Sequence, residues 1–370
     1  MKLSKRVDII RLFSNLSNRR KWGAIICILF FSTILIYSCH KSDGEGSSII
    51  ILEKHEDKNV EVTAQRINTS DGYMLSFYSF LQANKSGLYI TPVDAIRDSI
   101  LFEISTNDSS NHQNFSHDLS GVIRKGNGPQ ELLNINLSTK SASGDTLFFY
   151  STNSAAILSI DAEGTVLERK SAPKNVFTNG SAIGINNGFY LFPVFNPIVS
   201  KDNLLAIVNK NDSSIIYFYR PRVPAGYEPA IRNMVFPIGA VPNGFAFSFL
   251  GDRKFFITNF NGDLLKTVIL GESDPIPDPY IINDPSDSPG ATPYITKIEF
   301  FEDHLFILME NQIYILDYPD LLLSKILRIK HDGESELAPV VDFSVNSEKI
   351  FLRIGREGLF TVDLNKNWLN

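Results

Sequence analysis

Short apolar segments separated by polar turns recur along most of this chain, and they restrict its fold more than any other feature. The segments are runs of about four to eight residues bounded by Asn, Asp, Gly and Ser, which is the pattern of β-strands and their turns. With 27 Phe and 13 Tyr in the chain, these runs are rich in the aromatic and β-branched residues that strands favour. No convincing amphipathic helix pattern interrupts the series. The sequence therefore predicts an all-β protein.

The strand pattern also repeats as a longer unit. Its copies are Gly72–Ile123, Asp145–Lys170, Gly188–Arg220, Gly244–Leu270, Tyr294–Ile329 and Val340–Leu364. Corresponding turn positions are 45 to 58 residues apart. A period of this length, with about four strands in each unit, is typical of a β-propeller, in which each sheet packs against the next around a ring. Six copies predict six blades. A pair of β-sandwiches is the alternative, which suits the composition but not the period.

The first forty residues have a different character. Seven Lys and Arg residues and one Asp precede Trp22, and the apolar run Trp22–Tyr37 contains 16 residues. A helix needs roughly 20 residues to span a bilayer comfortably, whereas a basic segment followed by a short apolar run is typical of a secretory signal. The run ends in Ile36-Tyr37-Ser38-Cys39, which resembles the lipobox of bacterial lipoproteins, where the cysteine is acylated. An uncleaved signal-anchor helix is the alternative.

Cysteine usage favours lipid attachment at Cys39. Cys27 and Cys39 are the only cysteines, so the body of the protein has no disulfide, even though an exported body would be in an oxidising compartment. A single cysteine directly after a signal sequence is explained by acylation. We therefore expect a signal peptide over 1–38, a lipid-anchored Gly/Ser-rich tether over 39–48 and the propeller domain over 49–370.

The charge balance of the body disfavours nucleic acid as a partner. After removal of residues 1–38 the chain has 28 Lys and Arg and 40 Asp and Glu, a net charge of −12. A protein that binds nucleic acid through its surface usually presents a basic patch. We expect the membrane, reached through Cys39, and a protein or glycan to be the partners of a monomer.

One short motif stands out between the strand patterns. The segment 124–132 reads R-K-G-N-G-P-Q-E-L, and its Gly126, Gly128, Pro129, Glu131 and Leu132 match a G-x-G-P-x-E-[FL] string. This string, together with the lipobox-like start and the six units, resembles the TolB-like six-bladed β-propeller lipoproteins of Gram-negative envelopes. The motif is either a lock between blades or a ligand contact at the mouth of the ring. It is not a nucleotide loop, because the G-x-G-x-x-G spacing and the following helix are both missing.

The resemblance implies a propeller fold, an address in the cell envelope and, for most members, no established reaction. His40 rather than Asp follows Cys39, which by resemblance to known sorting rules favours the outer membrane. The body would face either the periplasm or the cell surface.

Signals for catalysis or metal binding are few. His112 and His117 lie in a polar segment with no carboxylate at ligand spacing, so a surface loop is the better account. We expect Asp303-His304 to lie in a hairpin turn. The G-x-S-x-G elbow of α/β-hydrolases is absent. Glu299 or Asp342 could supply ligands to a metal as in propeller lactonases, but nothing else in the sequence marks them, and we expect no cofactor.

Two segments have the composition of binding loops. Gly271–Pro293 contains six prolines and five acidic residues, and we expect a projecting acidic loop rather than a calcium site. The second segment is Tyr219–Pro242. Its aromatic and basic side chains offer stacking and bidentate hydrogen bonds to a carbohydrate or carboxylate, and a blade-to-blade crossover is the alternative. These candidate ligand-binding residues are Tyr219, Arg220, Arg222, Tyr227 and Arg232.

Together these observations favour a membrane-anchored lipoprotein whose propeller binds a protein or glycan partner without catalysis. A metal-dependent propeller hydrolase or lactonase acting in the central tunnel is the alternative function. A purely architectural envelope protein is a third reading.

Overall fold

The computed structural model divides the chain into two compact units, Met1–Ser47 and Ser48–Asn370. All the residues that the structure describes belong to the second unit. They are 48–53, 56–67, 80–84, 87–91, 100–105, 114–118, 135–151, 156–161, 166–171, 184–194, 204–209, 211, 214–219, 235–249, 253–270, 295–331, 336–355 and 358–369.

The described part is all-β, as the strand pattern predicts. Apart from strands it contains two short 3₁₀ helices, η1 (Glu56–Lys58) and η3 (Lys366–Leu369), and no α-helix. Accordingly, no helix within those ranges has the length and apolar character needed to cross a membrane.

Three of the sheets are four-stranded antiparallel meanders, with strands paired in chain order. The first contains β3 (Phe80–Ala83), β4 (Gly87–Thr91), β5 (Ile100–Ser105) and β6 (Asn114–Asp118). The second contains β7 (Ile135–Lys140), β8 (Leu147–Ser151), β9 (Ala156–Ile160) and β10 (Val166–Ser171). The third contains β11 (Gly184–Asn186), β12 (Phe189–Val194), β13 (Leu204–Asn209) and β14 (Ile215–Tyr219).

A fourth sheet has the same meander with one strand added from the start of the unit. The meander consists of β15 (Val235–Val241), β16 (Gly244–Phe249), β17 (Lys254–Asn259) and β18 (Leu264–Leu270). The added strand is β1 (Ser48–Leu52), which pairs in parallel with β18.

The fifth sheet has eight strands in the order β19-β20-β21-β22-β2-β25-β24-β23. These are β2 (Asn59–Arg66), β19 (Ile295–Phe301), β20 (His304–Met309), β21 (Gln312–Asp317), β22 (Leu322–His331), β23 (Val340–Val345), β24 (Lys349–Ile354) and β25 (Gly358–Asp363). Strand β2 joins the two halves of this sheet. It runs parallel to β22 through most of its length, and its last residues, Gln65 and Arg66, pair antiparallel with β25.

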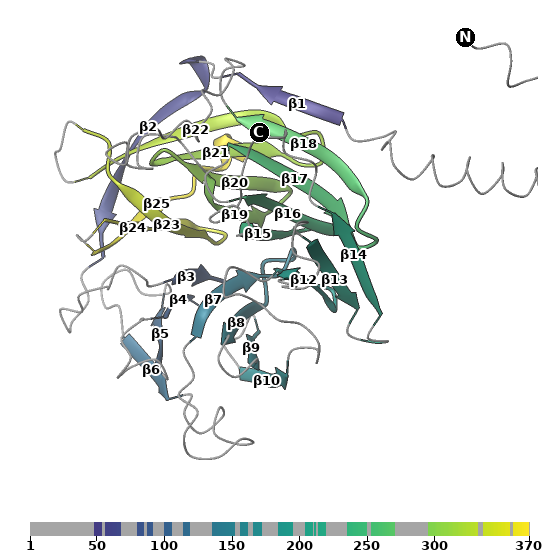
Figure 1. The fold of residues 1–370 in the computed structure, drawn as a ribbon. Helices are drawn as coiled ribbons and strands as arrows, with labels where there is room; N and C mark the ends of the chain where they lie inside the picture. Colours follow the sequence, from purple (N-terminus) through teal and green to yellow (C-terminus); the bar gives the residue numbers. More distant parts are fainter. Residues whose placement is uncertain are drawn as a thin grey trace, which may run out of the picture. The chain divides into compact units, whose positions relative to one another are not determined.

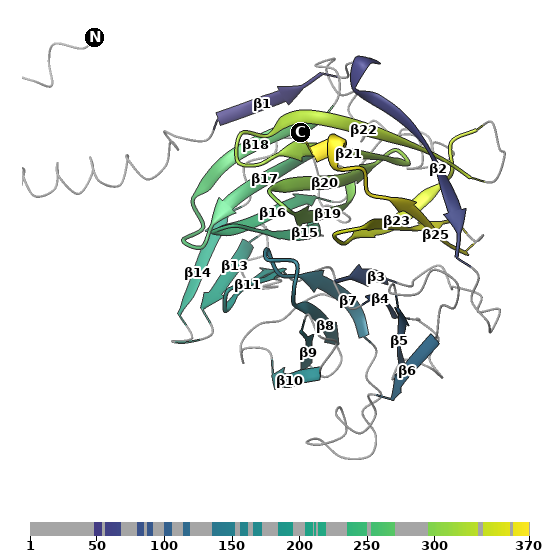
Figure 2. The same ribbon diagram turned by 180° about the vertical axis from the view of Figure 1, so that it is seen from behind.

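The end strands β3, β7, β11, β15, β19 and β23 gather near the middle of the unit, with the later strands of each meander farther out (Figures 1 and 2). Contacts link β15 to β19, β19 to β23, β23 to β3, β3 to β7, β7 to β11 and β11 back to β15. These strands start 45 to 60 residues apart along the chain, close to the period of the sequence. Antiparallel four-stranded meanders arranged radially around their first strands form a β-propeller.

The hydrophobic core lies between neighbouring meanders of strands. One cluster joins β15–β18 to β19–β22 and contains Phe255, Val268, Ile307 and Tyr314. Another joins β19–β22 to β23–β25. Strands covered on both faces have nearly continuous apolar sequences. Strand β20 is an example, since its sequence is H-L-F-I-L-M and every one of its residues is buried.

Close packing of the first strands requires a small residue at Gly239. A Cβ atom built on Gly239 of β15 would lie 2.8 Å from the backbone oxygen of Ile298 on β19. Any side chain at this position would therefore push the two strands apart.

The structure corrects two loops expected from the sequence. The segment Tyr219–Pro242 is not one loop, since its last part forms β15. Pro237 is accommodated there because the pairing with β16 shifts register between Val235 and Ile238. Likewise, the polar segment around His117 contains a strand: His117 lies on β6 opposite Leu101. Strand β6 is the end strand of its sheet, a position that tolerates polar residues.

Candidate functional site

Strand β3 is the end strand of its sheet, so one of its edges has no strand partner. The backbone groups on this edge would be costly to bury without hydrogen bonds. Side chains of β23 provide acceptors for its N–H groups. Leu81 donates its backbone N–H to Asp342 Oδ2 at 2.8 Å, and Ala83 donates to Ser344 Oγ at 2.8 Å. Asp342 and Ser344 are two residues apart, which places both side chains on the same side of β23.

The first layer of this network is an ion pair between β19 and β23. Lys297 Nζ lies 2.8 Å from Asp342 Oδ1 and also donates to the backbone oxygen of Leu81 at 2.6 Å. The N–H of Phe343 donates to Asp342 Oδ1 at 2.8 Å. Each carboxylate oxygen of Asp342 therefore accepts at least one hydrogen bond. Side chains of β19 and β23 together provide hydrogen-bond partners for the backbone of β3.

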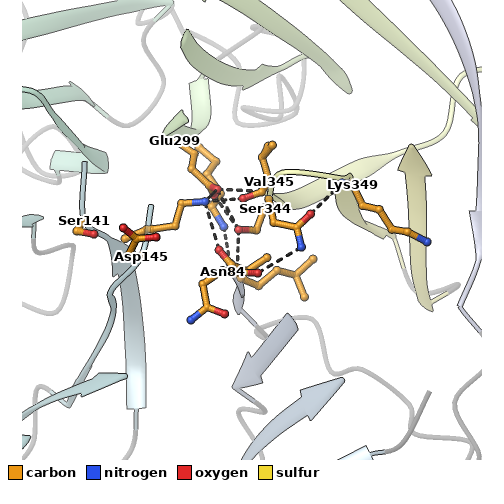
Figure 3. Close-up of polar contacts among 12 residues, drawn as sticks. Asn84, Ser141, Asp145, Glu299, Ser344, Val345 and Lys349 are labelled. Atoms are coloured by element: carbon orange, nitrogen blue, oxygen red, sulfur yellow. Dashed lines mark hydrogen bonds and ion pairs between the residues drawn. The ribbon is translucent and has the colours of Figure 1, made fainter. Parts of the chain in front are cut away.

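The second layer is centred on Lys140 of β7 and Glu299 of β19, which form a buried ion pair. Lys140 Nζ also donates to the backbone oxygens of Val345 at 2.6 Å and Ala83 at 3.3 Å. Glu299 accepts from Ser344 Oγ at 2.9 Å and from the backbone N–H of Val345 at 2.9 Å. This layer connects β3, β7, β19 and β23, one strand from each of four meanders. Figure 3 shows Glu299, Ser344 and Val345 converging on one point.

Asparagines extend the network to the turns beyond the strands. Asn346 Nδ2 donates to the backbone oxygen of Asn84 at 3.2 Å, and Asn346 Oδ1 accepts from the N–H of Lys349 at 2.9 Å. Asn84 Nδ2 in turn donates to the backbone oxygen of Asp161, after β9, at 2.8 Å. Figure 3 labels Asn84 and Lys349 on the two sides of this chain of contacts.

Burial governs the electrostatics of the network. Lys140 is 5% exposed and Glu299 is 3% exposed. Burial lowers the pKa of Lys140, and the charge and hydrogen bond of Glu299 oppose this effect. Burial also lowers the pKa of Arg353, against the influence of Asp342. Uncompensated charges would be costly here, so each lysine is placed against a carboxylate.

This arrangement is suited to holding strands together. Two carboxylates and two lysines, with backbone groups of β3 and β23, form direct hydrogen bonds. The oxygens of Glu299 and Asp342 that could bind a metal are instead bonded to lysines, a hydroxyl and backbone N–H groups. Within the described ranges, no group of three or more His, Cys, Asp or Glu is placed to hold a metal ion.

Most candidate residues from the sequence lie outside the described residues. These are Cys39, Gly126, Gly128, Pro129, Glu131, Arg220, Arg222, Tyr227 and Arg232. The segment Gly271–Pro293 lies outside them too. Tyr219 is described and is the last residue of β14, where it pairs with Leu204.

The hairpin expected at Asp303-His304 is confirmed. Glu302 and Asp303 connect β19 to β20 with φ angles of 44° and 61°, as in the two-residue turns that suit antiparallel strands. His304 opens β20, and its Nε2 lies 3.2 Å from Asp317 Oδ1 on the next strand.

The sequence marks Glu299 and Asp342 only as possible metal ligands, and Lys140, Lys297 and Ser344 are not predicted from it. A signal did exist in β19. Its sequence I-T-K-I-E-F-F has Lys297 and Glu299 two residues apart within an apolar strand, so both point to the same face. The partners of these charges are far away in sequence, and no local pattern reveals them.

The fold and network define a β-propeller protein with polar side chains joining its first strands. A protein from Bacteroides fragilis described as exported is similar in structure, with 14% identity and a TM-score of 0.49 over 86% of this chain and 100% of that chain. Virginiamycin B lyase from Staphylococcus aureus has 13% identity and a TM-score of 0.43 over 82% of this chain and 99% of its own. A member of the DUF4221 family from Bacteroides vulgatus has 11% identity and a TM-score of 0.43, covering 82% and 96%. No protein-family model and no curated protein matches the sequence.

Proposed function

We propose that this protein is a lipid-anchored envelope protein whose six-bladed propeller binds a protein or glycan partner and catalyses no reaction. The observation that carries the non-catalytic part is the bonding of Glu299 and Asp342. Both carboxylates are engaged by lysines and by groups of β23, so neither is presented to a metal or a substrate. Their role is to hold the ring of first strands together.

Division of the eight-stranded sheet at β2 supports the proposed six blades. Strands β19 to β22 form one four-stranded meander, and β23 to β25 form three strands of another. Gln65 and Arg66 of β2 pair with Thr361 and Phe360 of β25, which supplies the missing fourth strand. This closure by an early strand of the chain supports a ring of six units, as does the series of six end strands in which each contacts the next.

The anchor and address rest on the sequence. Cys39 follows the apolar run Trp22–Tyr37 and is, with Cys27, one of only two cysteines. The lipobox-like end and the G-x-G-P-x-E string at Gly126–Glu131 support a TolB-like outer-membrane lipoprotein. Labelled palmitate should enter the wild-type protein in cells but not the Cys39→Ala variant. Equal labelling of both would refute acylation at this residue.

Candidate contacts for the partner come from the segment after β14. Tyr219 ends that strand, at the end of its sheet away from β11, and the basic residues Arg220 and Arg222 follow directly in the sequence. An aromatic ring and guanidinium groups together can provide stacking and bidentate hydrogen bonds for a sugar or a carboxylate.

Elemental analysis of the protein purified from membranes tests the non-catalytic role. We expect no divalent metal at stoichiometric amounts after dialysis. One tightly held ion per chain, lost on substitution of acidic residues of this chain, would instead support a metal-dependent hydrolase or lactonase.

A glycan array and chemical cross-linking in cells test the binding role. The Tyr219→Ala variant and a double Arg220→Ala/Arg222→Ala variant should bind the partner with an affinity at least about tenfold lower than that of the wild type. Lys366→Ala removes an exposed lysine elsewhere on the propeller and should leave binding unchanged. Equal binding by all variants would refute the candidate site.

A further inference from the structure

Strand β1 leaves apolar side chains on the outside of the propeller. Ile49 is 68% exposed and Ile51 is 48% exposed. On the adjacent strand, Leu265 is 39% exposed and lies two residues before Thr267, the partner of Ile49. Three of the five large hydrophobic residues that are exposed within the described ranges thus lie on β1 and β18. Grouped exposed apolar residues of this kind mark an interaction surface.

The position of these side chains is fixed by the rest of β1. All five residues of β1 pair in parallel with β18, from Ser48 opposite Lys266 to Leu52 opposite Leu270. Ile50 and Leu52 pack against the core cluster between two sheets. Because side chains alternate along a strand, Ile49 and Ile51 project from the opposite face of the same strand and cannot turn inward.

The chain itself indicates what covers this surface. Eight residues lie between Cys39 and Ser48, and a chain of this length has an end-to-end distance of at most about 30 Å even when it is fully extended. If Cys39 is acylated, β1 is the part of the propeller held nearest to the lipid. Isoleucine and leucine side chains partition favourably into the boundary between headgroups and acyl chains.

We propose that the outer face of β1, formed by Ile49 and Ile51 with the neighbouring Leu265, docks on the lipid surface and fixes the orientation of the propeller on its membrane. This inference rests on the proposed acylation of Cys39. Lipid attachment would then act together with a protein surface, in the manner of two-signal membrane binding.

Fluorescence quenching in vesicles tests the docking. Full-length protein with Ile49→Trp is produced in cells, purified from membranes and reconstituted into phosphatidylcholine vesicles with brominated acyl chains. Trp368 is the one tryptophan that remains after removal of residues 1–38, and its signal, measured in the parent protein, is subtracted. We expect the added fluorescence to fall at least about twofold relative to vesicles without bromine. Ile51→Trp provides a second reporter on the same face.

Val341→Trp is the matched control, because Val341 is also an exposed apolar residue, at 37%, but lies on the inner strand β23. Its fluorescence should be unaffected by bromine. Adding Ile51→Asp to Ile49→Trp should reduce the quenching, because a carboxylate is costly to bury in lipid.

The possible failures can be told apart. A wild-type protein that does not float with the vesicles would refute the anchoring proposal and the docking with it. A protein that floats but shows equal quenching at Ile49→Trp and Val341→Trp would refute the docking alone. A blue-shifted but unquenched Ile49→Trp signal would show that a protein, such as a second copy of the chain, covers the surface, and would also refute lipid docking.

Discussion

Lys140 and Glu299 form a buried ion pair between two strands that share no sheet, 159 residues apart in the chain. Removing one member would leave the other charge buried and unpaired, which typically costs about 3–5 kcal/mol. We therefore expect Lys140→Met and Glu299→Gln each to lower the free energy of unfolding by an amount of this order. The double variant should lose less than the sum of the two, by a coupling of about 1–3 kcal/mol.

Urea unfolding of the four proteins measures this coupling. Lys366→Met is the matched control, because it removes the more exposed ion pair with Glu302 and should change stability by only about 0–1 kcal/mol. Additive losses in the double variant would contradict a direct interaction between Lys140 and Glu299.

Ser344 connects the backbone of β3 to the carboxylate of Glu299. Its Oγ accepts from the N–H of Ala83 and donates to Glu299. Ser344→Ala leaves that buried N–H without its acceptor, so we expect a loss of about 1–3 kcal/mol in unfolding free energy. Ser143→Ala, in the exposed turn after β7, removes hydrogen bonds at the surface and should change stability by less than about 0.5 kcal/mol. Similar effects of the two substitutions would argue against the role given to Ser344.

Asn186 ties β11 to the turn between β15 and β16. Its Nδ2 donates to the backbone oxygens of Val241 at 2.7 Å and Gly244 at 2.8 Å, and Asn186 is fully buried. Asn186→Ala should therefore cost about 1–3 kcal/mol in a urea unfolding experiment. Asn261→Ala, at an exposed turn position, serves as the control with little expected effect. A loss no greater than that of Asn261→Ala would show that these hydrogen bonds do not stabilise the fold.

Tyr318 gives the stability a pH dependence at alkaline pH. Burial raises its pKa above the ordinary value of 10.0, and its hydroxyl donates to the backbone oxygen of Pro242 at 3.1 Å. Since the pKa is higher in the folded state, this contribution is complete below pH 10 and is lost as the pH rises through the folded-state pKa. The unfolding free energy of the wild type should thus decrease relative to that of Tyr318→Phe above about pH 10. A difference between the two proteins that stays constant with pH would contradict this assignment.

The strand content was predictable because strand formation has a local signature. Aromatic and β-branched runs separated by polar turns predict the strands, and the period of these runs predicts the repeated meanders. The turn residues at Asp303-His304 likewise predict the hairpin there. First strands were harder to recognise. Val235–Val241 forms β15 but lies in a segment with the composition of a loop, because Pro237 argues against a strand unless the pairing shifts register there.

By itself, the sequence determined the all-β character, the repeat length and the expectation of an anchored, acidic body, since these depend on residue type and local spacing. Only the tertiary structure decided which charges meet. Lys140, Lys297, Glu299 and Asp342 are distributed over three strands of different meanders, and each needs a partner because burial penalises an unpaired charge. The pairing of β1 with β18, and of β2 with both β22 and β25, was likewise beyond the sequence. Such contacts join segments about 200 to 300 residues apart, and the free energy that selects them comes from backbone pairing and packing in the folded state and not from any local preference.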